Sequence, residues 1–159
     1  MTLFKITIAS FVLFTTNLHQ VKGQELKKQT KVIKTEAEWK ETLSPEVFKI
    51  MREKGTERPY TGKYDKHFEK GTYVCKACNT ELFKSTNKYD SHCGWPAFDK
   101  SIAENIYTNS DFSFGMKRTE ILCANCGGHL GHLFNDGPKA TTGKRFCVNS
   151  AALQFKEKD

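Results

Sequence analysis

The chain contains six cysteines, and four of them form two Cys-x-x-Cys pairs that are separated by 44 residues. Each pair has the spacing with which one turn presents two thiolates to a metal, and two pairs complete the tetrahedral shell of zinc. A shell closed by four thiolates leaves no position for a substrate, so this zinc would be structural. In an oxidising compartment the four thiols could instead form disulfides, with three possible connectivities, but adjacent pairs match zinc ligands better. The predicted zinc ligands are Cys75, Cys78, Cys123 and Cys126.

The fifth cysteine, Cys147, lies in a segment whose alternation predicts a β-strand. In a strand, Phe146 and Val148 would face the core. The remaining residues, Arg145, Cys147 and Asn149, would then project together from the opposite face. A guanidinium near a thiol favours the thiolate, and an amide can hydrogen-bond a substrate or a water. The segment therefore predicts a nucleophilic cysteine; the alternative is a small buried hydrophobe with charged neighbours by chance.

The sixth cysteine, Cys93, lies where Gly94 and Pro96 predict a loop. A thiol on a loop can move, which suits a resolving cysteine that condenses with an oxidised partner. Trp95, in the same loop, is either an ordinary core residue or one wall of a pocket for a small apolar group such as a methyl. We therefore predict that Cys93 and Cys147 are a reactive redox pair, rather than packing residues or a structural disulfide.

Two histidines and a carboxylate form a third candidate cluster, made of His129, His132 and Asp136. Residues three apart face opposite sides of a regular strand, so both histidines can serve one site only if Gly131 interrupts the pleat. The four paired cysteines already complete a zinc shell. We therefore expect proton donation or hydrogen bonding from the histidines, rather than metal binding.

Two short helices are expected before the cysteine-rich part of the chain. Thr35 and Glu38 have the spacing of a capping box. Ser44 followed by Pro45 is typical of an N-cap and a first helical position, and Gly55 stands where the second helix would end.

The sequence after these helices predicts an antiparallel β domain. Short aromatic or β-branched runs are separated by Gly, Asn and Asp, and Phe112, Phe114 and Met116 alternate with other residue types. No internal repeat, low-complexity tract or second long apolar segment interrupts this part. The predicted fold class is mainly β, with short N-terminal helices, in a single domain.

The N-terminus predicts export. Lys5 precedes an uncharged, mostly apolar stretch over 6–18 that is too short to span a bilayer comfortably, and Val21 and Gly23 fit a small-residue cleavage site. The alternatives are an uncleaved anchor or an N-terminal helix of the fold. The expected organisation is a signal peptide over 1–23, a polar tether over 24–34 and one functional domain over 35–157.

The charge balance identifies no partner. The formal net charge is +7, and it would be +5 once Lys5 and Lys22 are removed with the signal peptide. The lysines after residue 23 suit a solvated tether better than a nucleic-acid patch. Cleavage would leave 136 residues, which suit one domain with one core.

Five segments resemble motifs of the B-type methionine-R-sulfoxide reductases, in the same order and over about residues 36–155. Agreement between several independent motifs makes a chance resemblance improbable. The segments are Thr56–Gly62, Cys93–Pro96, Gly115–Glu120, His129–His132 and Arg145–Leu153.

The resemblance implies two antiparallel sheets with helices at the N-terminal end, clipped by a four-cysteine site that holds one structural zinc. It implies reduction of the R epimer of methionine sulfoxide in oxidised proteins, with the free amino acid left open, and a thioredoxin-like dithiol as reductant. Cys147 would be the nucleophile and Cys93 the resolving thiol. The substrate pocket implied by the family contains Trp95, His129, His132, Asp136, Arg145 and Asn149.

The chemistry of sulfur gives these residues an order of action. Sulfoxide sulfur is a poor electrophile until its oxygen is protonated or strongly hydrogen-bonded, so a thiolate and a proton donor must converge on adjacent atoms. We expect Cys147 to attack the sulfur, the two histidines and Asn149 to protonate or polarise the oxygen, and Trp95 to hold the methyl group. Cys93 would then condense with the sulfenic acid, and an external dithiol would reduce the disulfide.

Two other functions fit part of the sequence. A non-catalytic, secreted zinc-ribbon binding module explains the paired cysteines but needs neither Cys93 nor Cys147. A thiol-disulfide oxidoreductase would more often carry its active cysteines in one Cys-x-x-Cys motif. We expect an exported monomer, in a periplasm, a secretory lumen or the exterior, that binds no nucleic acid and has no stable membrane association.

Overall fold

The structure is a computed structural model that describes residues 32–158. The predicted signal peptide and most of the predicted tether lie outside the described residues. None of the helices in the described part has the length and apolar character needed to cross a membrane.

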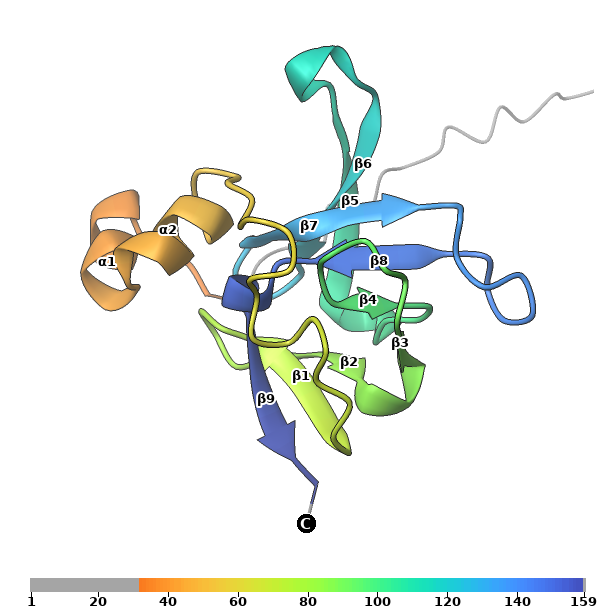
Figure 1. The fold of residues 1–159 in the computed structure, drawn as a ribbon. Helices are drawn as coiled ribbons and strands as arrows, with labels where there is room; N and C mark the ends of the chain where they lie inside the picture. Colours follow the sequence, from red (N-terminus) through yellow and green to blue (C-terminus); the bar gives the residue numbers. More distant parts are fainter. Residues whose placement is uncertain (1–31, 159) are drawn as a thin grey trace, which may run out of the picture.

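Two short helices, α1 (Glu36–Thr42) and α2 (Pro45–Met51), open the fold (Figure 1). The Thr35 hydroxyl accepts from the Glu38 N–H, and the Glu38 carboxylate accepts from the Thr35 N–H at 2.7 Å, so the predicted capping box is confirmed. The Ser44 hydroxyl likewise accepts from the Val47 N–H. Cap residues satisfy N–H groups that have no partner inside the helix.

The end of α2 differs from the prediction. The helix stops at Met51 with Arg52 as its C-cap, so Gly55 lies beyond the position where a C-terminal cap belongs. The Gly55 N–H still donates to the Lys49 carbonyl at 2.9 Å, and Lys54 takes the positive φ of 57° that usually falls to glycine. The chain therefore turns away from the helix through Lys54.

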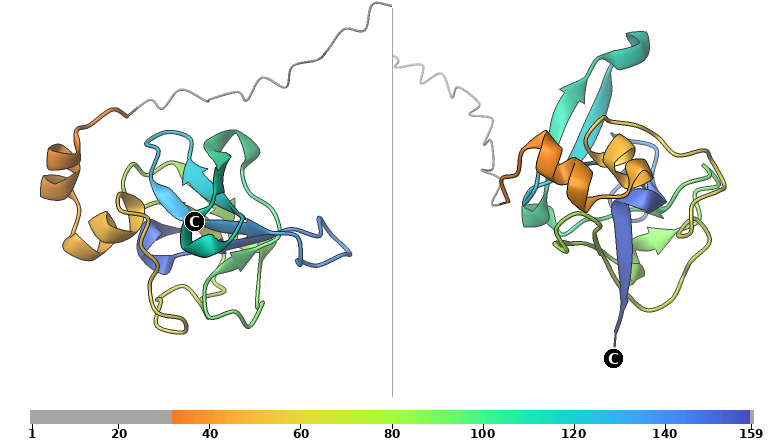
Figure 2. Two further views of the ribbon diagram at one scale, coloured as in Figure 1. Left: turned by 90° about the horizontal axis from the view of Figure 1, so that it is seen from above. Right: turned by 90° about the vertical axis from the view of Figure 1, so that its left-hand side faces the viewer.

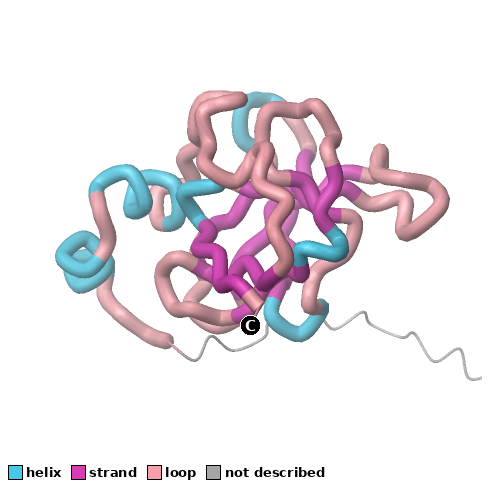
Figure 3. Tube along the Cα trace, turned by 60° about the horizontal axis from the view of Figure 1, so that its bottom comes forward, coloured by secondary structure: helices cyan, strands magenta, loops and turns pink. Residues whose placement is uncertain are grey.

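Nine strands form two antiparallel sheets in the described part, which confirms the predicted mainly β class. The smaller sheet has the order β2-β1-β9 and the larger one the order β3-β4-β8-β7-β6-β5. Loops surround the strands, which gather at the centre of the molecule (Figure 3). The strands are β1 (Gly71–Cys75), β2 (Glu81–Lys84), β3 (Lys88–Tyr89), β4 (Ala97–Phe98), β5 (Ile106–Asp111), β6 (Arg118–Cys123), β7 (His129–Phe134), β8 (Arg145–Val148) and β9 (Leu153–Glu157).

An aromatic core joins the two sheets. Phe83 of the smaller sheet stacks on Phe98 of the larger one, with ring centroids 4.3 Å apart, and the Tyr73 ring meets Phe98 edge-on at 5.1 Å. All three side chains are fully buried. The helix α2 packs against β7 and the short helical turn η4 (Ser150–Ala152). Burial of this size dominates the stability of a small domain.

The alternation of Phe112, Phe114 and Met116 does not form a strand. These residues lie at the tip of the hairpin between β5 and β6, where η3 (Ser113–Gly115) turns the chain, and all three side chains are exposed. Figure 1 shows this hairpin projecting from the body of the molecule. The strand prediction was wrong at this point because a period of two also arises in an exposed turn.

Candidate active site

The two unpaired cysteines lie together. Cys147 is on β8, and Cys93 is in the loop between β3 and β4, close to the point where Ala97 of β4 pairs with Cys147. Their Sγ atoms are 3.6 Å apart, and both thiols are free. A disulfide needs an S–S distance of about 2.05 Å, so a small movement of the loop would join them.

The pair shares one proton unequally. The hydrogen bond from Cys147, followed by that from the Ser91 hydroxyl, lowers the pKa of Cys93 to about 5 despite partial burial. The pKa of Cys147 is raised, first by its hydrogen bond to Cys93 and then by burial. The hydrogen bond between the two sulfurs therefore favours the thiolate on Cys93 over the thiolate on Cys147.

Arg145 and Asp136 form an ion pair beside the cysteines. The Arg145 Nε and a terminal nitrogen lie 2.8 and 2.7 Å from the two carboxylate oxygens of Asp136, and the guanidinium lies 4.3 Å from the centre of the Phe134 ring. The Arg145 charge lowers the pKa of both cysteines, although it is not the largest influence on either. Asp136 thus holds Arg145 and does not line the pocket.

A pocket of about 130 Å³ opens beside the Cys147 thiol. It brings together four of the residues predicted for the site, Trp95, His132, Cys147 and Asn149. The indole N–H of Trp95 donates to the Glu57 carbonyl at 3.2 Å, which fixes the ring as one wall. The other lining residues are Thr56, Arg118, Gly131, Phe134 and Val148. A space of this size suits one small side chain rather than a large ligand.

Each histidine of the site is held by its own carboxylate. His132 Nε2 lies 2.8 Å from Asp111, which leaves Nδ1 for a substrate or a water. Burial lowers the pKa of His132, although Asp111 opposes this effect. His129 is buried, with Nδ1 2.8 Å from Glu120 and no hydrogen-bond partner for Nε2 among the described residues. The two rings are 5.4 Å apart, so His129 lies behind His132 and not on the pocket wall.

The predicted break in the pleat is present at Gly131. Glu120 and Ile121 of β6 pair with His132 and Gly131, after which the register shifts so that Leu122 pairs with His129. This irregularity lets histidines three residues apart approach one another. A Cβ on Gly131 would collide with the Cys147 carbonyl, so only glycine fits here.

Asn149 is committed mainly to the backbone. Its Oδ1 accepts from the Glu57 N–H and its Nδ2 donates to the Leu130 carbonyl, both at 3.1 Å. The Glu57 carboxylate in turn accepts from the Ser150 and Ala151 N–H groups, at 2.6 and 2.9 Å. One amide hydrogen of Asn149 remains for a substrate.

Sequence reasoning did not assign a role to the carboxylates and the arginine around the histidines. Arg118 donates to Asp111 at 2.7 Å, and Lys54 donates to Glu120 at 2.8 Å. Glu120 is buried, and hydrogen bonds from His129 and Lys54 outweigh its burial and lower its pKa. The available signal was alternation, since Arg118 and Glu120 are charged residues two apart at the start of a strand whose second half is apolar.

The four paired cysteines meet at a second place. Cys75 and Cys123 end β1 and β6, and the turns after them bring in Cys78 and Cys126. The sulfurs all lie within 4.8 Å of one another, with two of the contacts at 3.6 Å. Four thiolates at the zinc distance of about 2.3 Å would be separated by about 3.8 Å. The cluster therefore fits one tetrahedral metal ion.

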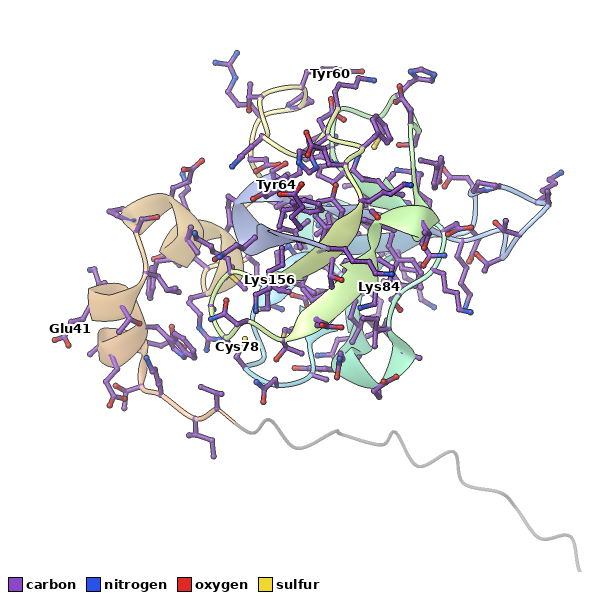
Figure 4. All side chains as sticks on the ribbon, turned by 90° about the horizontal axis from the view of Figure 1, so that it is seen from below. Glu41, Tyr60, Tyr64, Cys78, Lys84 and Lys156 are labelled. Atoms are coloured by element: carbon purple, nitrogen blue, oxygen red, sulfur yellow. The ribbon has the colours of Figure 1, made fainter. Side chains whose placement is uncertain are left out.

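The cluster is remote from Cys93 and Cys147. Figure 4 labels Cys78 in the cluster and Tyr60, whose N–H donates to the Gly94 carbonyl in the redox loop at 2.7 Å. The two residues lie in clearly separate parts of the molecule. A metal in the cluster would not touch the pocket.

Comparison with known proteins identifies the family. The SelR domain matches residues 43–157. The chain is 50% identical over 137 residues to a probable methionine-R-sulfoxide reductase B of Caenorhabditis elegans, which covers 85% of this chain and 90% of that protein. It is 57% identical over 127 residues to the peptide methionine sulfoxide reductase MsrB of Acinetobacter baylyi, over 79% of this chain and 91% of that protein. The chain belongs to the B-type methionine-R-sulfoxide reductases.

Family membership agrees with the geometry of the site. The matched region contains Cys93 and Cys147 as well as the four-cysteine cluster. A methionine-R-sulfoxide reductase needs a thiol beside a small pocket, and Cys147 has that position.

Replacement of Gly131 by alanine should damage the site more than a comparable change elsewhere. The new Cβ would meet the Cys147 carbonyl, so we expect the free energy of unfolding to fall by about 3 kcal/mol or more, and the reaction of Cys147 with iodoacetamide to change. Gly143→Ala is the matched control, because Gly143 also has a positive φ but has open space around it. Equal losses in urea titrations of the two variants would contradict the role of this close approach.

The low pKa of Cys93 should depend on Cys147. In the wild type the Cys93 thiolate forms above a pKa of about 5, so Cys93 should already alkylate rapidly at neutral pH. Cys147→Ala removes the largest cause, and the midpoint should rise toward the ordinary thiol pKa of about 8.5. Mass spectrometry of peptides alkylated at a series of pH values measures the midpoint for Cys93. Ser91→Ala should raise the midpoint less, and an unchanged midpoint in Cys147→Ala would refute the shared proton.

Proposed function

We propose that this protein reduces the R epimer of methionine sulfoxide in oxidised proteins, with Cys147 as nucleophile and Cys93 as resolving thiol. The observation that carries the proposal is the 3.6 Å approach of the two sulfurs at a pocket of about 130 Å³. Family membership supports the reaction, and the geometry supports the roles.

In the first step Cys147 gives up its proton and acts as the nucleophile. The Cys147 sulfur attacks the sulfoxide sulfur, and a proton passes to the sulfoxide oxygen, directly or through His132. The hydroxyl oxygen then passes from the methionine sulfur to the Cys147 sulfur as the S–S bond between them breaks, so that Cys147 becomes a sulfenic acid and methionine leaves. Sulfoxide is reduced by two electrons and Cys147 is oxidised by two. Trp95 forms a wall for the methyl group, and Asn149 offers its remaining amide hydrogen.

The second step restores the enzyme through Cys93. Its thiolate attacks the Cys147 sulfur, the S–S bond forms, and the oxygen leaves as water after taking up a proton. An external dithiol of the thioredoxin type then reduces the disulfide by thiol-disulfide exchange. The low pKa of Cys93 supports this role because the thiolate is the attacking species.

His129, Arg145 and Asp136 act from behind the pocket wall. His129 and Glu120 support His132 from the buried side, and Asp136 orients Arg145 next to the cysteines. The Arg145 charge stabilises whichever sulfur of the pair is ionised. These residues therefore position the reacting groups, whereas Cys147 and Cys93 react.

The four-cysteine cluster holds one structural zinc in this proposal. Its support is the set of sulfur distances, which match a tetrahedral shell, and the position of the cluster between the two sheets. When bound, zinc would supply cross-linking of the fold and no redox chemistry.

We also propose that the protein is exported. The apolar N-terminal segment and the small-residue pattern before residue 24 support a cleaved signal peptide, followed by a tether over 24–34 and a catalytic domain over 35–157. The protein would then work as a monomer in a periplasm, a secretory lumen or the exterior. A zinc-ribbon binding module remains disfavoured because it leaves the redox pair and the pocket without a role.

The reaction can be tested on separated sulfoxide epimers. Residues 24–159, supplied with dithiothreitol, should reduce R-sulfoxide and leave S-sulfoxide unchanged. Cys147→Ser should lose all turnover. Cys93→Ser should release one equivalent of methionine per chain and then stall with thioredoxin as reductant. Turnover by Cys147→Ser, or reduction of the S epimer alone, would reject the proposal.

A separate experiment tests whether the four-cysteine cluster binds zinc. The purified chain should contain one zinc, and Cys78→Ser should lose it and unfold at much lower urea, with a loss on the order of 3 kcal/mol or more. Cys93→Ser is the matched control, because it removes a cysteine outside the cluster and should retain the zinc. Equal zinc content in both variants would rule out the cluster as the ligand set.

A further inference from the structure

The hairpin of β5 and β6 carries an exposed apolar tip. Phe112, Phe114 and Met116 are 68%, 87% and 51% exposed, within five consecutive residues. The right-hand view of Figure 2 shows from a second side that the end of the hairpin extends beyond the rest of the molecule. We call these three residues the apolar tip.

Two features of the apolar tip do not favour stability of the fold. Exposed aromatic side chains gain no stability from burial, and clusters of them on a surface usually serve an interaction. Phe114 also adopts φ 54° and ψ 27°, a left-handed conformation that bulky residues rarely take. Strain of this kind collects at functional sites. Neither Phe112 nor Phe114 belongs to the buried core of the described residues.

Contacts connect the tip directly to the pocket. The Arg118 guanidinium lies 5.8 Å from the centre of the Phe114 ring, and Arg118 also lines the pocket. Asp111, which precedes Phe112, binds both Arg118 and His132. The apolar tip therefore adjoins, through Arg118 and Asp111, the pocket where the sulfoxide would bind.

We propose that the apolar tip binds the polypeptide segment that flanks the oxidised methionine, so that segments with apolar flanks are preferred substrates. This inference rests on the proposed function. The pocket of about 130 Å³ has room for one side chain, so the flanking residues must pass over its rim. Methionine is mostly buried in folded proteins among other apolar residues, and these become its exposed neighbours when a damaged protein unfolds.

The position and the apolar character of the tip indicate that it binds the substrate rather than another partner. The tip joins the pocket through Arg118, whereas Cys93, which an external dithiol must reach, does not line the pocket. An exposed apolar surface is suited to unfolded polypeptides of varied sequence, because hydrophobic contact is not directional.

The test compares two substrates in a double variant, Phe112→Ser with Phe114→Ser. One substrate is a short peptide with methionine-R-sulfoxide between leucines, and the other is N-acetyl-methionine-R-sulfoxide, which has no flanks. With dithiothreitol as reductant, kcat/KM on the peptide should fall about tenfold, equivalent to about 1.4 kcal/mol. The value of kcat/KM on the small substrate should change by less than about twofold, because this substrate has no flanking residues that could contact the tip.

Several outcomes would overturn the inference. An equal loss on both substrates would make the tip a support of the pocket, and no loss on the peptide would leave it without a substrate role. A loss seen only with a protein dithiol would assign the tip to the reductant, and a wild-type dimer that the variant dissociates would assign it to a second copy. Absence of activity of the wild type on both substrates would instead refute the proposed function.

The control variant is Ile33→Ser. Ile33 is 83% exposed and precedes α1, away from the pocket-lining residues, so its loss removes a comparable exposed apolar side chain. We expect it to leave both rates unchanged. Circular dichroism of all variants checks that the fold is retained.

Discussion

The structure of the site depends on the close approach of β7 to β8 at Gly131. This residue pairs with Val148, and its missing side chain leaves space for the Cys147 carbonyl. The adjoining register shift against β6 turns His132 and His129 to the same side. The thiol, the pocket wall and both histidines therefore derive their positions from one irregularity in the sheet. A regular strand would place the histidines on opposite faces.

The six cysteines divide by position as well as by chemistry. The four-cysteine cluster lies at the ends of β1 and β6, which belong to different sheets, so a metal there would link the sheets. Cys147 and Cys93 lie on β8 and on the loop between β3 and β4, with their sulfurs 3.6 Å apart. In the proposed function, a metal held by the cluster would stabilise the fold, whereas Cys93 and Cys147 would form and break a bond. Separation lets the two sets meet these opposite needs.

The sequence predicted the parts of this site that depend on local pattern. Strand alternation located Cys147 opposite Phe146 and Val148, and cap residues located both helices. The ion pairs of His132 with Asp111 and of His129 with Glu120 depend on the register between β5, β6 and β7, which one sequence does not reveal. Alternation was also misleading at the hairpin tip, because a period of two carries no information about whether a partner strand is present.

Glu57 shows how the N-terminal part of the domain contributes to the site. Its carbonyl accepts from Trp95, its N–H donates to Asn149, and its carboxylate caps the N–H groups of Ser150 and Ala151. Burial raises the pKa of this carboxyl, so those N–H donors have to offset the cost of keeping its charge. One residue thus fixes the Trp95 wall relative to the end of β8. The helices α1 and α2 are therefore part of the active-site support, because the segment that follows them delivers Glu57 to the junction of loop and strand.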